Sequence, residues 1–211
     1  MSYLDEKQRN PWLSMWSHPR ETVRQYIQED LSKWIWFLVI VSGMKFVLDN
    51  ANIQNFGDQV PVGAILFWAL FIGSFIGILQ WWMLSGSLLL VGRVLGLEAE
   101  WKDLKKAVSL SNVPYVWGFV LWIVKIFAFG QENFTPETPM IDQSLTLVAL
   151  IVLCYLIDFI LVAWSVAVLS KGIGEVYGLS SWAGFGLVLL TGVVLTLVFL
   201  LIGGPIVLLL L

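Results

Sequence analysis

Residues 145–170, LTLVALIVLCYLIDFILVAWSVAVLS, decide the fold of this chain. Apart from Asp158 they carry no charge, and a bilayer core about 30 Å thick needs roughly 20 apolar helical residues to cross it. Four further apolar stretches lie at 34–48, 61–91, 107–129 and 183–211. With 58% hydrophobic and only 13% charged residues, the pattern predicts an all-α, polytopic membrane protein with five transmembrane helices.

Positive charge is confined to alternate connections between the five stretches. Ten of the 12 lysines and arginines lie on one predicted side: Lys7, Arg9, Arg20, Arg24, Lys33, Arg93, Lys102, Lys105, Lys106 and Lys171. The opposite connections, 49–60 and 130–144, contain none. Because cytoplasmic loops carry the excess of lysine and arginine, we expect a multi-pass cell-membrane protein with a cytoplasmic N-terminus and its C-terminus outside.

Two segments on the predicted cytoplasmic side have the spacing of amphipathic helices. The first is expected to start at Pro19, and its apolar stripe is Val23, Ile27, Leu31 and Trp34. The second lies in 96–108, and its stripe is Leu97, Trp101, Leu104 and Val108. We therefore predict a cytoplasmic N-terminal segment over 1–33, a transmembrane domain over 34–211, and two cytoplasmic-side interfacial helices.

Three local features refine the spans. The first stretch, 34–48, is only roughly 22 Å long as a helix, so the preceding helix or a thinner bilayer must help it to cross. Pro114 predicts a kink near Val113, because proline disfavours helical backbone at the residue before it. Residues 172–178 are predicted to form a flexible turn between the last two spans.

Asp158 is the sharpest candidate for a functional residue, because an acid near the bilayer midplane is costly. Lys45 in the first span lies at a similar predicted depth and is the best partner for it. The pair is interpreted either as a clamp between the first and fourth spans or as part of a proton or cation relay. A protonated Asp158 capped by Tyr155 or Ser165 is a third reading. Lys125 is predicted to snorkel toward the outer surface.

Catalytic and cofactor motifs are missing from the sequence. His18 is the only histidine, Cys154 is the only cysteine, and no H-E-x-x-H or Cys/His pattern suited to a metal is present. The basic residues are explained by topology, so no nucleic-acid partner is expected. The sequence favours a protein that is not an enzyme and uses no cofactor.

Three segments resemble the Yip1 domain family in its bacterial form. They are NPWLSMWSHPRET at 10–22, AVSLSNVP at 107–114 and KGIGEVYGLS at 171–180. The resemblance implies a five-span membrane protein with a cytoplasmic N-terminus. Eukaryotic members of that family act with small Rab GTPases in vesicle traffic. This chain lacks their acidic D-L-Y-G-P motif, so Rab binding is not carried over.

The leading functional interpretation is an accessory or assembly partner of other integral membrane proteins, including a transport complex or a second copy of itself. Besides the lipid bilayer, its contact surface is predicted to use Trp12, Trp16, Trp101 and the small-residue pair Gly73 and Gly77. The alternative is a small transporter or ion-translocating protein that uses Asp158, with Lys45 and Gln80 along the path. A membrane-shaping protein is a third, weaker interpretation.

Overall fold

The computed structural model describes residues 10–210, with side chains up to Leu201. The start of the predicted N-terminal segment, with Lys7 and Arg9, lies outside the described residues, as does Leu211 at the end of the last predicted span. The helices are α1 (Pro11–Ser17), α2 (Pro19–Gln28), α3 (Ile35–Ile53), η1 (Phe56–Asp58), α4 (Val62–Val94), α5 (Trp101–Ser111), α6 (Val113–Phe129), η2 (Gly130–Phe134), α7 (Pro139–Asp142), α8 (Leu145–Val176) and α9 (Ser181–Leu210).

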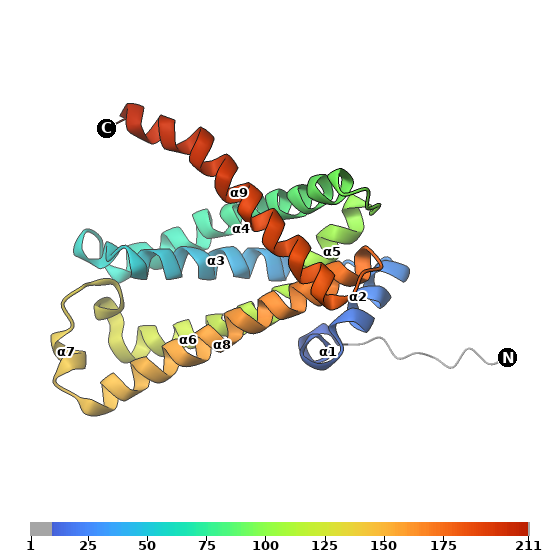
Figure 1. The fold of residues 1–211 in the computed structure, drawn as a ribbon. Coiled ribbons are helices and arrows are strands. Elements are labelled where there is room, and N and C mark those ends of the chain that lie inside the picture. The colour runs from blue at the N-terminus through green and yellow to red at the C-terminus, as the bar shows by residue number, and fades with distance from the viewer. Residues whose placement is uncertain (1–9, 211) are drawn as a thin grey trace.

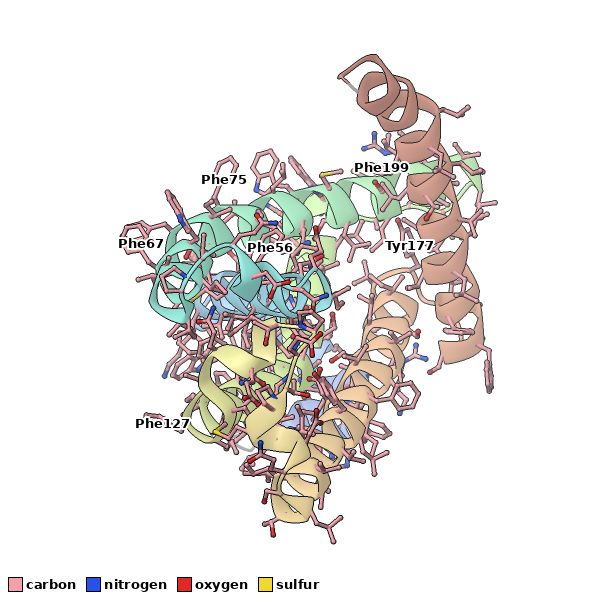
Figure 2. All side chains as sticks on the ribbon, turned by 90° about the vertical axis from the view of Figure 1, so that its left-hand side faces the viewer. Phe56, Phe67, Phe75, Phe127, Tyr177 and Phe199 are labelled. Carbon is pink, nitrogen blue, oxygen red and sulfur yellow. The ribbon has the colours of Figure 1, made fainter. Side chains whose placement is uncertain are left out.

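Five helical segments are long and apolar enough to cross a membrane. They are Ile35–Ile53, Val62–Val94, Trp101–Phe134, Leu145–Val176 and Ser181–Leu201. Large apolar side chains point outward from them, among them Phe67, Phe75 and Phe127 (Figure 2). A soluble protein rarely exposes a continuous apolar surface of this extent. The predicted all-α membrane fold with five spans is confirmed.

Three helices run past the predicted ends of their spans. α3 continues from 48 to Ile53, α4 from 91 to Val94 and α8 from 170 to Val176. The prediction that 172–178 forms a flexible turn is therefore wrong. The turn begins at Tyr177, whose hydroxyl donates a 2.8 Å hydrogen bond to the Leu88 carbonyl. A helix forms its own backbone hydrogen bonds and does not need apolar side chains to continue. The three helices can therefore extend past the apolar stretches from which the spans were predicted.

The long helices form two antiparallel pairs crossed by a fifth helix (Figure 1). α3 packs against α4, α6 packs against α8, and α9 runs diagonally across α4 and α8. Glycines permit the α3–α4 contact: a Cβ at Gly73 would lie 2.7 Å from the Met44 Cα, and Gly77 faces Val39 and Gly43. The Gly73–Gly77 pair therefore packs within the chain, as small residues allow between membrane helices.

Helices α1, α2 and α5 close one end of the bundle, which we call the cap. α2 begins at Pro19 as predicted but ends at Gln28, so Leu31 and Trp34 fall beyond it. Val23 and Tyr26 on α2 are buried, and the helix packs against α8 and α5. The apolar stripe of α2 thus contacts protein, and the placement of this helix at a membrane interface stays a prediction.

The second predicted amphipathic helix, α5, is largely internal. It starts at Trp101 rather than at 96, and its Leu104, Ala107 and Leu110 are fully buried. α5 is continuous with α6 except for a break at Asn112, next to the predicted kink at Val113. It therefore adjoins the third candidate span, and its buried face contacts protein. Its placement at a membrane interface stays a prediction.

Ionic contacts fasten α2 and the residues after it to α8 and α5. Glu175 near the end of α8 accepts from Arg20 Nε at 3.0 Å and from Arg24 Nε at 2.6 Å. The hydrogen bond to Glu175 raises the pKa of the Arg24 guanidinium. Lys106 on α5 donates to the carboxylate of Asp30, and this bond holds the Asp30 pKa below its ordinary value. The Lys106–Asp30 contribution is therefore present at neutral pH and is lost as the pH falls through that lowered pKa.

A Glu175→Gln substitution is expected to loosen the cap without unfolding the bundle, because a neutral amide attracts neither guanidinium strongly. Hydrogen–deuterium exchange of the α2 amides should become severalfold faster, while exchange in α3 and α4 stays unchanged. Glu100→Gln, which removes only the exposed pair with Lys102 at 3.0 Å, serves as the control. Equal exchange of α2 in the two variants would contradict a fastening role for Glu175.

Candidate functional site

The candidate site is a cluster of charges enclosed by α3, α6 and α8. Lys45 on α3 is fully buried, and its Nζ lies 2.8 Å from Asp49 Oδ2 and 3.0 Å from Asp158 Oδ1. Lys45 and Asp49 are four residues apart, so they share one face of α3. The structure brings Lys45 and Asp158 together from two different spans, as their predicted depths required.

Helix α6 completes the binding of Asp49. The Tyr115 hydroxyl donates to Asp49 Oδ2 at 2.9 Å, and Trp122 Nε1 donates to Asp49 Oδ1 at 2.8 Å. The Tyr115 ring also lies 4.2 Å from the Lys45 ammonium, within the range of a cation–π contact. Both oxygens of this carboxylate are thus satisfied by hydrogen bonds from aromatic side chains of a neighbouring helix.

Gly118 on α6 leaves the space in which the charges meet. A Cβ at this position would contact the Lys45 side chain and would lie 2.7 Å from Asp158 Oδ1. A larger residue here would separate α6 from α3 and α8 or force the ion pair apart. The small residue therefore lets three helices share one charged cluster.

Asp158 is held by charge rather than by hydrogen bonds. Its buried Oδ1 faces Lys45 at ion-pair distance but has no hydrogen-bond partner among the described residues. Ser165 donates instead to the Leu161 carbonyl, and the Tyr155 hydroxyl contacts Asn52. Neither of the residues considered as caps for a protonated Asp158 therefore bonds to it, and its close contact is with the Lys45 ammonium.

Lys125 occupies a different place from the one predicted for it. Its side chain is only 3% exposed, and its Nζ lies 3.9 Å from the Trp122 ring centroid and 4.8 Å from that of Tyr155. The prediction that it snorkels to a surface is wrong, because two aromatic rings enclose it. Among the described residues, no carboxylate lies within ion-pair distance of Lys125, which contacts aromatic rings instead.

Sequence reasoning missed Asp49, Tyr115 and Trp122. Asp49 was assigned to a loop because the apolar stretch ends before it, whereas α3 continues to Ile53. Its spacing from Lys45 was a usable signal, since acid–base pairs four residues apart are neighbours on a helix. The two aromatic donors gave no such signal, because their contacts depend on how α6 is oriented toward α3.

The predicted contact residues are divided between the interior and the surface. Trp12 packs edge-on against Trp34 and Trp117, with ring centroids 5.6 and 6.4 Å apart, and so holds α1 in place. Trp16 is half-buried, and Trp101 is exposed at the margin of the cap beside Trp82. Gly73 and Gly77 lie in the α3–α4 interface.

Ion pairs are the main feature of this site. No group of three or more His, Cys, Asp or Glu side chains that could hold a metal ion occurs within the described residues. Each carboxylate of the cluster lies at ion-pair distance from Lys45, as is typical of paired charges inside a helical membrane protein. Fold and site together define a multi-span integral membrane protein in which an ion pair joins two of the spans.

A family model described as Yip1 domain matches residues 13–203. The chain therefore belongs to the Yip1 family, whose members are membrane proteins and are not known as enzymes. Neither a curated protein nor a solved structure is significantly similar to it. The family assignment confirms the predicted membership of the Yip1 domain family.

Proposed function

We propose that this Yip1-family protein acts without catalysis, by binding other integral membrane proteins as an accessory or assembly partner. In this proposal it lies in the cell membrane with the cap in the cytoplasm. Arg20, Lys102 and Lys171 belong to the cap end of the bundle, whereas the connections 54–61 and 130–144 at the other end contain no lysine or arginine. That distribution supports the orientation through the positive-inside rule.

The observation that carries the proposal is the course of α9. Its first half packs on α8 and α4, with Leu187 and Thr191 buried. Beyond them the helix leaves the other spans (Figure 1), and Val193 and Phe199 are 55 and 70% exposed. A membrane helix that packs along only half of its length leaves a surface beside it that a helix of another protein can fill.

Small residues on the free half of α9 favour such a helix contact. A Cβ at Gly192 would meet no atom within 4 Å, in contrast to one at Gly73 or Gly77. Thr196, four residues on, donates its hydroxyl to the Gly192 carbonyl at 2.9 Å, so its polar group is already satisfied. Small residues at this spacing let two membrane helices approach closely. Gly192 and Thr196 are therefore an unoccupied small-residue pair on α9.

The cap would extend the same contact toward the cytoplasm. Trp16 and Trp101 remain accessible there and suit the headgroup region, where tryptophan is enriched. Trp12 and the Gly73–Gly77 pair are occupied by packing within the chain, so they do not belong to the proposed surface. Buried Val23 and Tyr26 make deletion of the N-terminal segment a poor test, because its removal would expose the core.

Photo-crosslinking in native membranes tests this proposal. A probe at Val193 is expected to capture an integral membrane partner that a probe at Phe127, 87% exposed on α6, does not. Gly192→Leu should abolish the capture without lowering the amount of protein. Gly86→Leu is the matched control, because Gly86 on α4 also has no atom within 4 Å of a Cβ.

Each outcome of the crosslinking has a defined meaning. Capture of the same membrane protein in near-stoichiometric amount supports the accessory role, and capture of a second copy identifies the partner as the chain itself. The proposal fails if the Val193 probe captures only lipid, or if Gly192→Leu and Gly86→Leu retain the partner equally well.

A further inference from the structure

A cavity of about 410 Å³ lies between the two helix pairs, on the cap side of the charge cluster. Its walls are mainly apolar and include Leu84 on α4, Val166 on α8 and Leu195 on α9. It is partly open rather than sealed, and its volume falls in the range of about 300–1,000 Å³ that is typical of small-molecule sites. Its position among membrane spans makes an apolar chain the fitting occupant.

The cavity ends at the level where the bilayer core ends. Trp81 lines the cavity and packs against Trp36 in the first turn of α3, with ring centroids 5.5 Å apart. Along α4, Trp82 lies roughly 30 Å from Val62, which is about the thickness of the hydrocarbon core. This end of the cavity therefore meets the headgroup region at the cap side.

An uncompensated cation stands at the same end. Lys105 Nζ lies 4.9 Å from the ring centroid of Trp101, 5.4 Å from that of Trp81 and 5.8 Å from that of Trp82. Its neighbours on α5 are paired, Lys102 with Glu100 and Lys106 with Asp30. Within the described part of the chain, no carboxylate lies within ion-pair distance of Lys105.

Helical spacing connects this cation to the cavity. Val108 on α5 and Asn112 just after its end line the cavity and follow Lys105 at three and seven residues, so the three side chains lie on one side of the helix. Trp81 belongs both to the cavity wall and to the aromatic surround of Lys105. The Lys105 ammonium therefore lies close to a wall residue of the cavity.

We infer that this site binds one anionic phospholipid from the leaflet on the cap side. Its phosphate would pair with Lys105, and one acyl chain would occupy the cavity between α4, α8 and α9. A single unpaired cation favours a headgroup with net negative charge over a zwitterionic one, and the bilayer supplies such lipids in the correct orientation. The indole N–H groups of Trp82 and Trp101 have no acceptor among the described residues and can donate to the headgroup.

The test compares lipids retained by the intact purified protein. The chain is reconstituted in mixed phosphatidylcholine and phosphatidylglycerol, extracted in mild detergent, and examined by native mass spectrometry. We expect one retained phosphatidylglycerol per chain. Lys105→Gln should reduce its preference over phosphatidylcholine about fivefold, the effect of one lysine near an anionic surface. Lys102→Gln, whose cation is paired and exposed, should leave the preference unchanged.

A second variant examines the cavity independently of the charge. Val166→Phe places a larger apolar side chain in the wall and should lower retention of both lipids while the melting temperature is kept. Equal lipid preference in Lys105→Gln and Lys102→Gln would overturn the inference, and so would full retention in Val166→Phe. If Lys105→Gln has a lowered melting temperature, Lys105→Arg is examined instead. It should keep the preference for phosphatidylglycerol, because it keeps the positive charge.

Discussion

Lys45→Met is expected to lose most of its folded population, the largest effect of any single substitution at the cluster. Removal of the ammonium strands two carboxylates, Asp49 and Asp158, between helices where water is scarce. Breaking a buried ion pair by removing one partner costs about 3–5 kcal/mol, a large share of a stability of about 5–15 kcal/mol. Melting of the purified protein in detergent and its abundance in the membrane measure the effect.

The control for this substitution is Lys171→Met. Lys171 lies near the cap end of α8, 5.6 Å from the Trp164 ring centroid and without a carboxylate at ion-pair distance within the described residues. The Lys171→Met variant should therefore have a melting temperature close to that of the unsubstituted protein. Normal abundance and melting of Lys45→Met would show that the cluster is not a clamp.

Asp158→Asn separates the clamp from the transport alternative. Lys45 keeps Asp49 in this variant, so the loss of stability should be smaller than in Lys45→Met. The double variant Lys45→Met, Asp158→Asn should be more stable than Lys45→Met alone. Only one carboxylate, Asp49, is then left without the ammonium, instead of two. A protein that stays fully stable as Asp158→Asn but loses ion flux in liposomes would favour translocation through the cluster instead.

Gly43→Ala is expected to destabilise the bundle, because the added methyl group forces α3 away from α4. The added Cβ would lie 2.5 Å from the Gly77 Cα and would also collide with the Gly73 carbonyl. Both contacts are with backbone, which cannot rotate away as a side chain could. Overpacking of this kind costs about 1–3 kcal/mol, sometimes more, and thermal melting in detergent would measure it.

A glycine in open space provides the comparison. Gly86→Ala on α4 meets no atom within 4 Å and should leave the melting temperature unchanged or raise it slightly, since alanine favours helix over glycine. Equal melting of Gly43→Ala and Gly86→Ala would contradict the close α3–α4 contact. A fall confined to Gly43→Ala would support it.

Hydropathy and charge spacing were enough to predict the number of spans and the helical class. Both signals are local: each residue's preference for lipid or water acts on its own segment, independent of which helices become neighbours. The similar depths of Lys45 and Asp158 followed from helical rise in the same way. The start of α2 at Pro19 and the break beside Pro114 follow from the backbone of proline, which is local as well.

Tertiary structure alone decided which helix faces meet. The Gly73–Gly77 pair was visible in the sequence, but its partner Gly43 was not, and neither was the free pair on α9. The space at Gly118, the donors Tyr115 and Trp122, and the burial of Lys125 depend on how α6 is rotated against α3 and α8. Such rotation results from the fit of side chains distant in sequence, and no local pattern of polarity contains it.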